Sequence, residues 1–304
     1  MPMMLSMPYI RSSRFMAHEL MRTSFVAEVS SNHNQDLERC KRFIETAAKV
    51  GCSAVKFQLF RIDRLFAPEI LSKSEQHRRR RQWELPLEFL PAISASCQEQ
   101  GIRFACTPFY LEAVNELLPY VDFYKIASYE LLREDLLTAC AETGKPVVLS
   151  TGMATLTEAM HAERVLRRAG CSDLTLLHCV SGYPTPPEEC NLSAIETLRR
   201  NCDCKVGWSD HSVNPGVIFR AVHKWQAEMV EFHLDLDKKG DEFEIGHCWL
   251  PYQIGSVIDS VNSGFRADGS GDKVPAPCEV SDRDWRADPS DGLRPRIKVR
   301  EAWR

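Results

Sequence analysis

The chain has 304 residues, of which 44% are apolar and 26% charged, and its formal net charge is −4. This composition is typical of a globular protein, and the charge gives no electrostatic reason to expect nucleic acid or an anionic membrane as a partner. No apolar stretch approaches the roughly 18 residues of a membrane span. Residues 1–24 lack the continuous apolar segment of a secretory signal, and we expect them to form an N-terminal arm. The twelve cysteines are scattered singly, which favours a reduced, cytoplasmic location.

Eight short apolar runs recur along the chain, and each is typical of a buried parallel strand. They are FVAEVSSNH, AVKFQ, IRFACTPF, DFYKIASYE, PVVLSTGM, LTLLHC, CKVGWSDH and EMVEFH. Amphipathic stretches predict helices over residues 36–50, 87–99, 132–143, 156–169, 215–227 and 250–265. Glycine follows the first four of these and precedes the next strand, as in the helix-to-strand step of a βα unit. The sequence therefore predicts an α/β fold, a TIM (β/α)8 barrel, as one domain over residues 25–266.

Two segments stand apart from this pattern. Residues 267–304 are rich in Gly, Pro, Asp and Arg, which predicts an irregular tail with no separate domain, although Trp285 and Trp303 suggest that it docks on a surface. The long connection over residues 61–86 contains the run HRRRR, which ends at Arg81. Such a run is usually a solvated face, and the alternative is that it lines an anion-binding mouth.

Two histidines end neighbouring strands of the predicted barrel. His211 and His233 follow the seventh and eighth apolar runs, and imidazoles at adjacent strand ends can share one metal ion while leaving positions open for substrate. Either histidine alone would more often be structural, but two at matching positions favour a metal site. Asp210 and Glu231 are the expected partners that fix the tautomers of the rings.

Lysines and hydroxyls also gather at the predicted strand ends. Lys56 and Lys125 end the second and fourth strands. Each alone could equally form a buried ion pair, extend its ammonium group to solvent, or be a surface residue on a misread strand. Together with nearby hydroxyls they form a plausible phosphate cradle, because ammonium and hydroxyl donors suit that anion. The hydroxyls belong to Thr107, Ser128, Ser150 and Ser209.

Two carboxylates complete the predicted mouth. Glu28 and Glu130 end the first and fourth runs, and Gln58 lies between them in chain order. Carboxylates beside lysines and a metal would bind sugar hydroxyls or move protons. The equally weighted alternative is that they neutralise the lysines.

Several segments between residues 25 and 250 resemble the sialic acid synthase family, which includes N-acetylneuraminate synthases and spore coat polysaccharide synthases. They are AEVSSNHNQD, GCSAVKFQ, FACTPF, YKIASYE, KPVVLSTGMAT, LLHCVSGYPTP, KVGWSDHS and VEFH. The family condenses phosphoenolpyruvate with an N-acetylated sugar aldehyde, such as N-acetylmannosamine, to give a nine-carbon 2-keto acid and phosphate. The resemblance implies a C–C bond-forming transferase of sialic acid biosynthesis.

The resemblance also implies roles for individual residues. It places a divalent cation, Mn²⁺ or Mg²⁺, on His211 and His233, which are expected to be catalytic together with Glu28 and Glu130. The implied phosphoenolpyruvate ligands are Lys56, Thr107, Lys125, Ser128, Ser150 and Ser209. The implied sugar-side residues are Glu28, Gln58, Glu130, Tyr183 and Glu244, the last at a position where the family usually has Asp.

The chain departs from the family at its C-terminal end. Typical members continue into an antifreeze-like domain that is swapped across a dimer and supplies an arginine to the partner's sugar pocket, and residues 267–304 are too few for it. Our hypothesis is that Arg286 or Arg294 replaces that arginine, and a homodimer remains one expected assembly. The alternatives are a related phosphoenolpyruvate-dependent synthase, a Schiff-base aldolase using Lys125, and a non-catalytic barrel that binds a sugar or a partner protein.

Overall fold

The computed structural model describes residues 23–303, so nearly all of the arm expected at residues 1–24 lies outside the described range. The chain divides after Asn262 into two compact units, close to the boundary predicted at residue 266. Among the described residues, no helix is both long enough and apolar enough to cross a membrane.

The first unit is built on eight parallel strands that pair in sequence order and close when β1 pairs with β8. The TIM barrel and all eight predicted strands are therefore confirmed. The strands are β1 Ser24–Glu28, β2 Ala54–Leu59, β3 Arg103–Pro108, β4 Phe123–Ile126, β5 Val147–Ser150, β6 Leu174–Cys179, β7 Lys205–Asp210 and β8 Met229–Leu234. A further two-residue strand, β9 Cys248–Trp249, adds to β8 in parallel and was not predicted.

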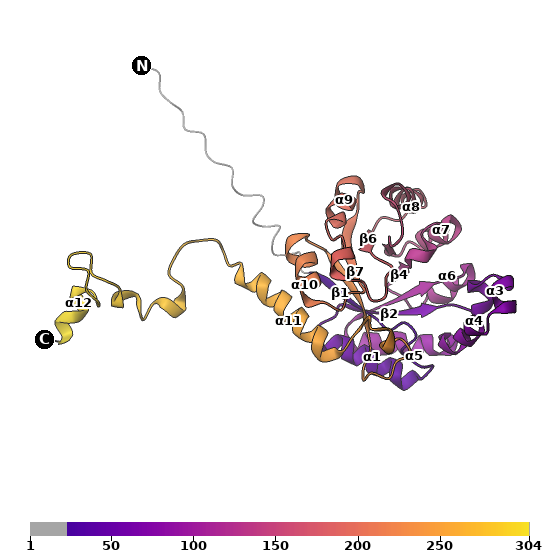
Figure 1. Cartoon of the computed structure of the whole chain (residues 1–304), viewed down its shortest axis with the longest axis horizontal. Coiled ribbons are helices and arrows are strands. Elements are labelled where there is room, and N and C mark those ends of the chain that lie inside the picture. Colours follow the sequence, from indigo (N-terminus) through magenta and orange to yellow (C-terminus); the bar gives the residue numbers. More distant parts are fainter. Residues whose placement is uncertain (1–22, 304) are drawn as a thin grey trace, which may run out of the picture. The chain divides into compact units, whose positions relative to one another are not determined.

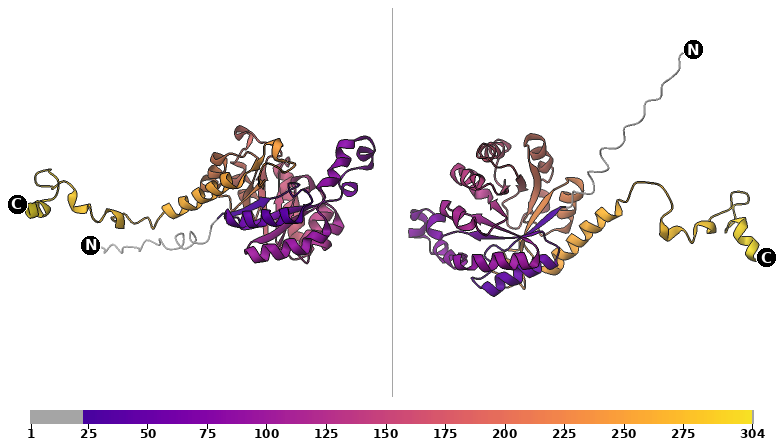
Figure 2. Two further views of the ribbon diagram at one scale, coloured as in Figure 1. Left: turned by 90° about the horizontal axis from the view of Figure 1, so that it is seen from below. Right: turned by 180° about the vertical axis from the view of Figure 1, so that it is seen from behind.

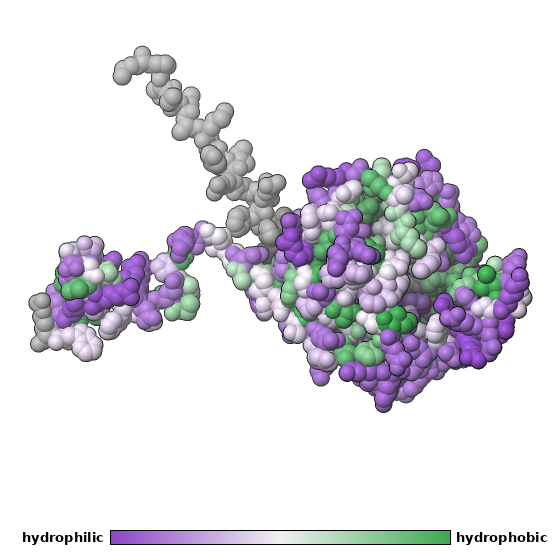
Figure 3. Space-filling model, in the orientation of Figure 1, coloured by the Kyte–Doolittle hydropathy of each residue, from purple (hydrophilic) through white to green (hydrophobic). Residues whose placement is uncertain are grey.

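Helices surround these strands (Figure 1), and two further views show the same arrangement (Figure 2). The helices are α1 Leu37–Lys49, α2 Ile62–Leu65, α3 Pro68–Lys73, α4 Glu75–Arg79, α5 Leu90–Gln100, α6 Leu111–Leu117, α7 Glu134–Glu142, α8 Leu156–Arg168, α9 Ala194–Asn201, α10 Pro215–Phe219 and α11 Pro251–Ala267. The six predicted helices are present, and α6, α9 and the three short helices α2–α4 are additions. The surface over α1 and around α4 is mainly hydrophilic (Figure 3), as expected for the outer faces of barrel helices.

One apolar layer fills the barrel interior. Its side chains come from seven strands and form one buried cluster: Val26, Ala54, Ala105, Phe123, Val148, Leu177 and Met229. The remaining strand, β7, contributes Gly207, where a Cβ atom would lie 2.2 Å from the Met229 carbonyl oxygen and 2.7 Å from Leu177 Cδ2. Glycine is thus the residue that fits this position of the packed interior.

A polar layer lies directly above the apolar one. Because side chains alternate between the two faces of a strand, the residue two positions further along points to the same interior. This rule gives Glu28, Lys56, Thr107, Lys125, Ser150, Cys179, Ser209 and Glu231. All eight are buried, and seven of them carry groups able to bind ions or move protons. The strand register therefore builds the mouth of the barrel.

The second unit, residues 263–304, contains little regular structure. It has the short helix α12 Ile297–Arg300 and the turns η7 Pro277–Glu279, η8 Arg283–Trp285 and η9 Glu301–Trp303. Asp288 organises it by accepting hydrogen bonds from the backbone of Ser290 and Ile297, while Arg300 pairs with Asp291 at 2.6 Å. Trp285 and Trp303, the residues expected to dock on a surface, are both exposed.

Candidate active site

The first part of the mouth is a lysine cluster made of Lys56, Lys125, Glu28 and Glu231. Lys125 Nζ lies 3.2 Å from Glu231 Oε1, and Lys56 Nζ lies 4.0 Å from Glu231 Oε2. Lys56 also forms a close ion pair with Glu28 and donates a hydrogen bond to Thr107 Oγ1 at 3.2 Å. Glu28 therefore neutralises a lysine, which was one of the two alternatives for it.

The two lysines differ in their electrostatic surroundings. Burial lowers the pKa of Lys125, since Glu231 is its one close carboxylate and Lys56 repels it. Burial also acts against the charge of Lys56, but Glu231 and Glu28 together raise its pKa. Burial would raise the pKa of Glu231, yet the two lysines hold it well below the usual value. Glu231 is therefore ionised where it lies between the two lysines.

Hydroxyl groups line the wall next to the lysine cluster. Ser209 Oγ donates to Glu231 Oε1 at 3.2 Å, and Ser128 Oγ accepts a hydrogen bond from the Gly152 amide at 2.9 Å. The buried hydroxyls of Ser150 and Ser181 have no hydrogen-bond partner among the residues that the structure describes. Buried polar atoms without partners are uncommon in proteins, so these hydroxyls are available to a ligand.

Gly152 keeps this wall open. A Cβ atom there would lie 2.4 Å from Ser181 Oγ and 2.8 Å from Ser128 Oγ, so any other residue would fill the space between the hydroxyls. The structure therefore brings the predicted cradle residues together and adds Ser181 and the Gly152 position to them.

Glu130 lies on the turn η3 Ser128–Glu130 that follows β4. It is buried, and its Oε2 atom has no hydrogen-bond partner among the described residues. Burial raises its pKa to about 7, although Arg133 and Lys125 act in the opposite direction. Glu130 can therefore exchange a proton near neutral pH, which suits a general acid or base.

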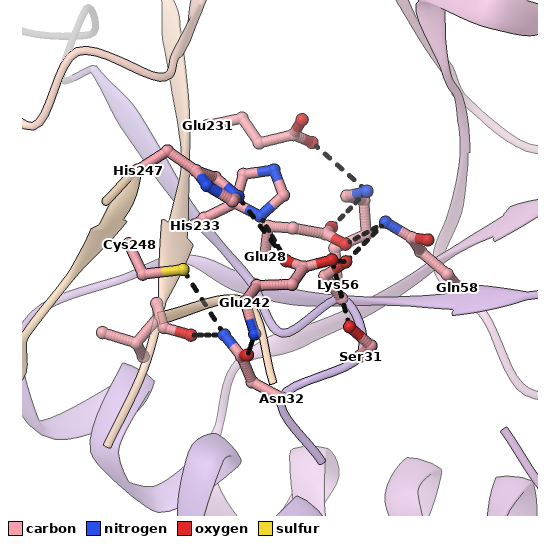
Figure 4. A network of polar contacts seen from close by, with 12 residues as sticks. Glu28, Ser31, Asn32, Lys56, Gln58, Glu231, His233, Glu242, His247 and Cys248 are labelled. Carbon is pink, nitrogen blue, oxygen red and sulfur yellow. Dashed lines mark hydrogen bonds and ion pairs between the residues drawn. The ribbon is translucent and has the colours of Figure 1, made fainter. Parts of the chain in front are cut away.

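The second part of the mouth is a histidine cluster made of His211, His233, His247 and Glu242, and Figure 4 shows the last three of these. The ring centres of His211 and His233 lie 5.4 Å apart, and those of His233 and His247 lie 4.5 Å apart. Tyr183 packs against His211 with its ring centre 4.1 Å away. The structure thus brings the predicted pair together beside Tyr183 and adds a third imidazole.

The hydrogen bonds of His211 leave one nitrogen free for a ligand. Its Nδ1 lies 2.7 Å from the Val180 carbonyl oxygen, which can only accept, so the proton is assigned to Nδ1 and the lone pair to Nε2. Burial lowers the pKa of His211 to about 3, and His233 contributes to the shift. The ring is therefore neutral, which is the form that binds metal ions.

Glu242 joins the histidines to the rest of the mouth. Its Oε2 atom lies 3.2 Å from His233 Nδ1 and 3.6 Å from His247 Nε2. Its Oε1 atom accepts hydrogen bonds from Ser30 Oγ at 2.6 Å and Ser31 Oγ at 3.1 Å. Burial would raise the pKa of Glu242, but the two histidines and Ser30 hold it well below its usual value.

A bridge of side chains connects the two clusters, as Figure 4 shows in part. Gln58 Nε2 donates to Glu28 Oε1 at 2.7 Å and to Ser30 Oγ at 3.1 Å, and Ser30 in turn donates to Glu242. The lysine and histidine clusters are therefore parts of one polar network.

The loop after β8 positions Glu242 through contacts with the loop after β1. The Glu242 amide donates to Asn32 Oδ1 at 2.9 Å, and Asn32 Nδ2 donates to the Leu234 carbonyl at 3.0 Å. Arg39 on α1 pairs with Asp235 at 2.8 Å and donates to the Asn32 carbonyl. These buried contacts fix the carboxylate relative to the strand ends.

The expected tautomer partners were wrong. Asp210 faces outward and accepts from the indole nitrogens of Trp208 and Trp249, because it is one position out of phase with the interior. Glu231 binds the lysine cluster instead. The Val180 carbonyl and Glu242 take the roles that had been assigned to Asp210 and Glu231.

Other predicted residues lie outside the network. Glu244 is exposed on η6 Phe243–Ile245 and forms no hydrogen bond or ion pair with the described residues, whereas Glu242, two positions earlier, does. The arginine run lies on α4 and η1 Arg80–Trp83, where Arg79 pairs with Glu75 and Arg81 with Asp63 on exposed surface. This agrees with a solvated face.

The chain matches a known family over most of its length. The NeuB family model matches residues 43–273. An uncharacterized protein of Methanocaldococcus jannaschii is 35% identical over 261 residues, covering 84% of this chain and 75% of that protein. The N,N'-diacetyllegionaminic acid synthase of Campylobacter jejuni is 34% identical over 271 residues, covering 85% of this chain and 81% of the synthase.

Solved structures agree with this similarity. The sialic acid synthetase of Leptospira borgpetersenii, crystallised with citrate, superposes with a TM-score of 0.74 and 28% identity, covering 88% of this chain and 93% of that one. A truncated 3-deoxy-D-arabino-heptulosonate 7-phosphate synthase of Thermotoga maritima has a TM-score of 0.65 and 11% identity over 82% of this chain and 89% of its own, which shows a shared fold alone. The extent of the family match and the identity to these relatives establish that the chain belongs to the NeuB family.

Proposed function

We propose that this protein condenses phosphoenolpyruvate with an N-acetylated amino sugar, of the N-acetylmannosamine type, to give a nine-carbon 2-keto sugar acid and phosphate. The observation that carries the proposal is the single polar network in which the lysine and histidine clusters meet across Gln58 and Ser30. Such a mouth offers an anion site and a metal site side by side. The names of relatives, among them synthases of legionaminic and pseudaminic acid, support the same reaction class.

The anion side would bind phosphoenolpyruvate. The ammonium groups of Lys56 and Lys125, the unpartnered hydroxyls of Ser150 and Ser181 and the open space at Gly152 supply donors and room for phosphate oxygens. Thr107, Ser128 and Ser209 complete this wall. Glu28 and Glu231 pair with the two lysines and so reduce the net positive charge of this cluster. A further positive charge nearby, such as a cation bound by the histidines, would strengthen the binding of a multiply charged anion.

A divalent cation, Mn²⁺ or Mg²⁺ as the family resemblance implies, fits the other side. His211 and His233 would hold it, since His211 Nε2 has its lone pair free and the Val180 carbonyl fixes the ring. When bound, such an ion polarises a carbonyl oxygen and so activates a sugar aldehyde. Glu130, with a pKa of about 7, would move protons, while Glu28 and Gln58 would orient the sugar beside Tyr183.

The test is phosphate release from phosphoenolpyruvate across several N-acetylated hexoses, with and without Mn²⁺. We expect sugar-dependent release that His211→Ala abolishes. The matched control is His161→Ala, because His161 is an exposed histidine on α8 that pairs with Glu134. Sugar-independent release, or equal turnover in His211→Ala and the unmodified protein, would contradict the proposal.

One observation favours a second candidate, a Schiff-base aldolase. Burial lowers the pKa of Lys125, and a lysine with a lowered pKa is the usual imine-forming nucleophile. Borohydride added with a keto acid separates the two reactions, because it reduces a lysine imine to a stable adduct. We expect no adduct, since Lys125 is held 3.2 Å from Glu231. An adduct that Lys125→Met removes would favour the aldolase.

A further inference from the structure

The histidine cluster contains more potential metal ligands than the predicted pair. One ligand atom from each of His233, Glu242, His247 and Cys248 can be chosen so that all four lie within 4.8 Å of one another. Figure 4 shows these side chains converging at the end of β8. His247 and Glu242 come from the loop between β8 and β9, which neither the sequence pattern nor the resemblance had assigned to the metal.

The spacing of His233 and His247 fits one shared ion. A ring nitrogen about 2.1 Å from a metal places the ring centre about 3.2 Å from it, so two rings on one ion are separated by about 4.5 Å at a right angle and about 6.4 Å when opposite. The observed separations are 4.5 Å for His233 and His247, 5.4 Å for His211 and His233, and 6.3 Å for His211 and His247. The His233–His247 separation matches the right-angle value, whereas the His211–His247 separation would need nearly opposite positions on the ion.

A separate observation also indicates a ligand at His247. Its side chain is buried, and Nδ1 has no hydrogen-bond partner among the described residues. The parallel pairing of β8 with β9 sets His233 opposite Cys248, which holds the neighbouring His247 beside His233. A buried nitrogen kept in place without a partner needs an explanation, and a cation supplies one.

We propose that His247 and Glu242 are additional ligands of the metal in this mouth, completing with His233 a set that favours zinc-type ions over Mg²⁺. The inference rests on the proposed function for the presence of a metal. Imidazole nitrogens suit Zn²⁺, Co²⁺ and Fe²⁺, whereas Mg²⁺ prefers oxygen ligands and water. The sulfur of Cys248, close to the same atoms, adds to this preference.

Binding of Co²⁺ to the chelator-treated full chain tests the inference without any turnover. Calorimetry gives the affinity, and the visible absorption of Co²⁺ reports a change in its ligands. We expect binding at least about 100-fold tighter than that of Mg²⁺. His247→Ala should weaken Co²⁺ binding by about 10-fold to 100-fold or more and change its spectrum, and Glu242→Gln should do the same. His161→Ala is the matched control and should keep the affinity and spectrum of the unmodified protein.

Thermal melting of the metal-free variants checks that they fold, and Glu242→Gln, which preserves shape, carries the test if His247→Ala does not fold. Unchanged Co²⁺ affinity and spectrum in a folded variant would overturn the inference, as would Mg²⁺ binding as tightly as Co²⁺. Sugar-dependent phosphate release by the unmodified protein is measured in a separate assay. If it is absent while Co²⁺ binding depends on His247, the proposed function fails and the ligand assignment stands.

Discussion

The lysine and histidine clusters have the same arrangement but differ in the charge of their basic side chains. Each is organised around a carboxylate that contacts two basic side chains: the buried Glu231 lies between Lys56 and Lys125, and the partly buried Glu242 lies between His233 and His247. In the lysine cluster the two lysines hold the pKa of Glu231 well below its usual value, whereas in the histidine cluster burial lowers the pKa of His247 and favours its neutral ring. The same arrangement of side chains can therefore form an anion site or a cation site, depending on which basic residue it contains.

The largest expected effect tests the charges of the lysine cluster. Glu231→Gln keeps the shape but removes the shared countercharge, leaving Lys125 buried without a close carboxylate. We expect the free energy of unfolding to fall by about 3–5 kcal/mol, measured by denaturant titration. Glu196→Gln, at a partly exposed position of α9 beside Arg199 and Arg200, is the control and should leave the free energy of unfolding nearly unchanged.

Glu242→Gln is the corresponding change in the histidine cluster. Its partners are imidazole rings and hydroxyls rather than ammonium groups, so the loss should be smaller, about 1–3 kcal/mol in the absence of metal. Equal losses for Glu231→Gln and Glu242→Gln would show that the two clusters do not differ in charge.

A pH-dependent prediction concerns Glu130, whose pKa is raised from 4.5 to about 7. The folded protein then holds this proton more tightly than the unfolded chain, so its contribution to stability is greatest below about pH 4.5 and is lost as pH rises to about 7. Glu130→Gln should remove up to about 3 kcal/mol of this dependence, measured by unfolding at pH 4.5 and pH 8. Glu142→Gln, an exposed change on α7, should leave it unaltered. A parallel pH dependence in Glu130→Gln and the unmodified protein would contradict the prediction.

Gly152 tests the room in the hydroxyl wall. Gly152→Ala should weaken phosphoenolpyruvate binding at least about tenfold and lower stability by about 1–2 kcal/mol, because its Cβ would lie 2.4 Å from Ser181 Oγ. Gly182→Ala is the matched control, since the nearest atom to its Cβ is 3.6 Å away. Calorimetry with phosphoenolpyruvate compares the two variants. Equal affinities would show that the space at Gly152 is not needed for binding.

The smallest expected effect lies in the bridge between the clusters. Ser30→Ala breaks the hydrogen bonds with Gln58 and Glu242, and we expect a loss of about 1–2 kcal/mol in unfolding free energy. Ser31→Ala removes only the 3.1 Å bond to Glu242 and should have the smaller effect. A larger loss in Ser31→Ala than in Ser30→Ala would show that the bridge is not what couples the clusters.

Much of the fold and of the lysine cluster was predictable because both follow strand periodicity. Apolar runs gave the eight strands, and residues such as Lys56, Lys125 and Ser150 lie in phase with the apolar interior layer. Asp210 lies out of phase with Ser209. A strict use of the same two-residue period would therefore not have predicted it as a partner of the histidines. The short helices α6 and α9 lack the length that makes a helical period visible.

The rest of the site could not be predicted because it depends on loop contacts. Glu242 and His247 belong to a segment with no repeating pattern, and Asn32, more than two hundred residues away, positions the Glu242 backbone. Glu244 carried the same chemistry in the same segment, so residue type alone could not separate it from Glu242. The β9 pairing, which brings His247 beside His233, involves two residues and gives no sequence signal.

The phase relation between β7 and the barrel interior has a consequence for tolerance to insertions. Ser209 and His211 serve the mouth while Asp210, between them, binds the two indoles outside. An insertion or deletion of one residue within β7 would exchange these faces, pointing a carboxylate inward and the His211 imidazole toward the surrounding helices. Added length between α8 and β6 would leave that order unchanged, so this protein should accept loop grafts far more readily than a one-residue change inside a strand.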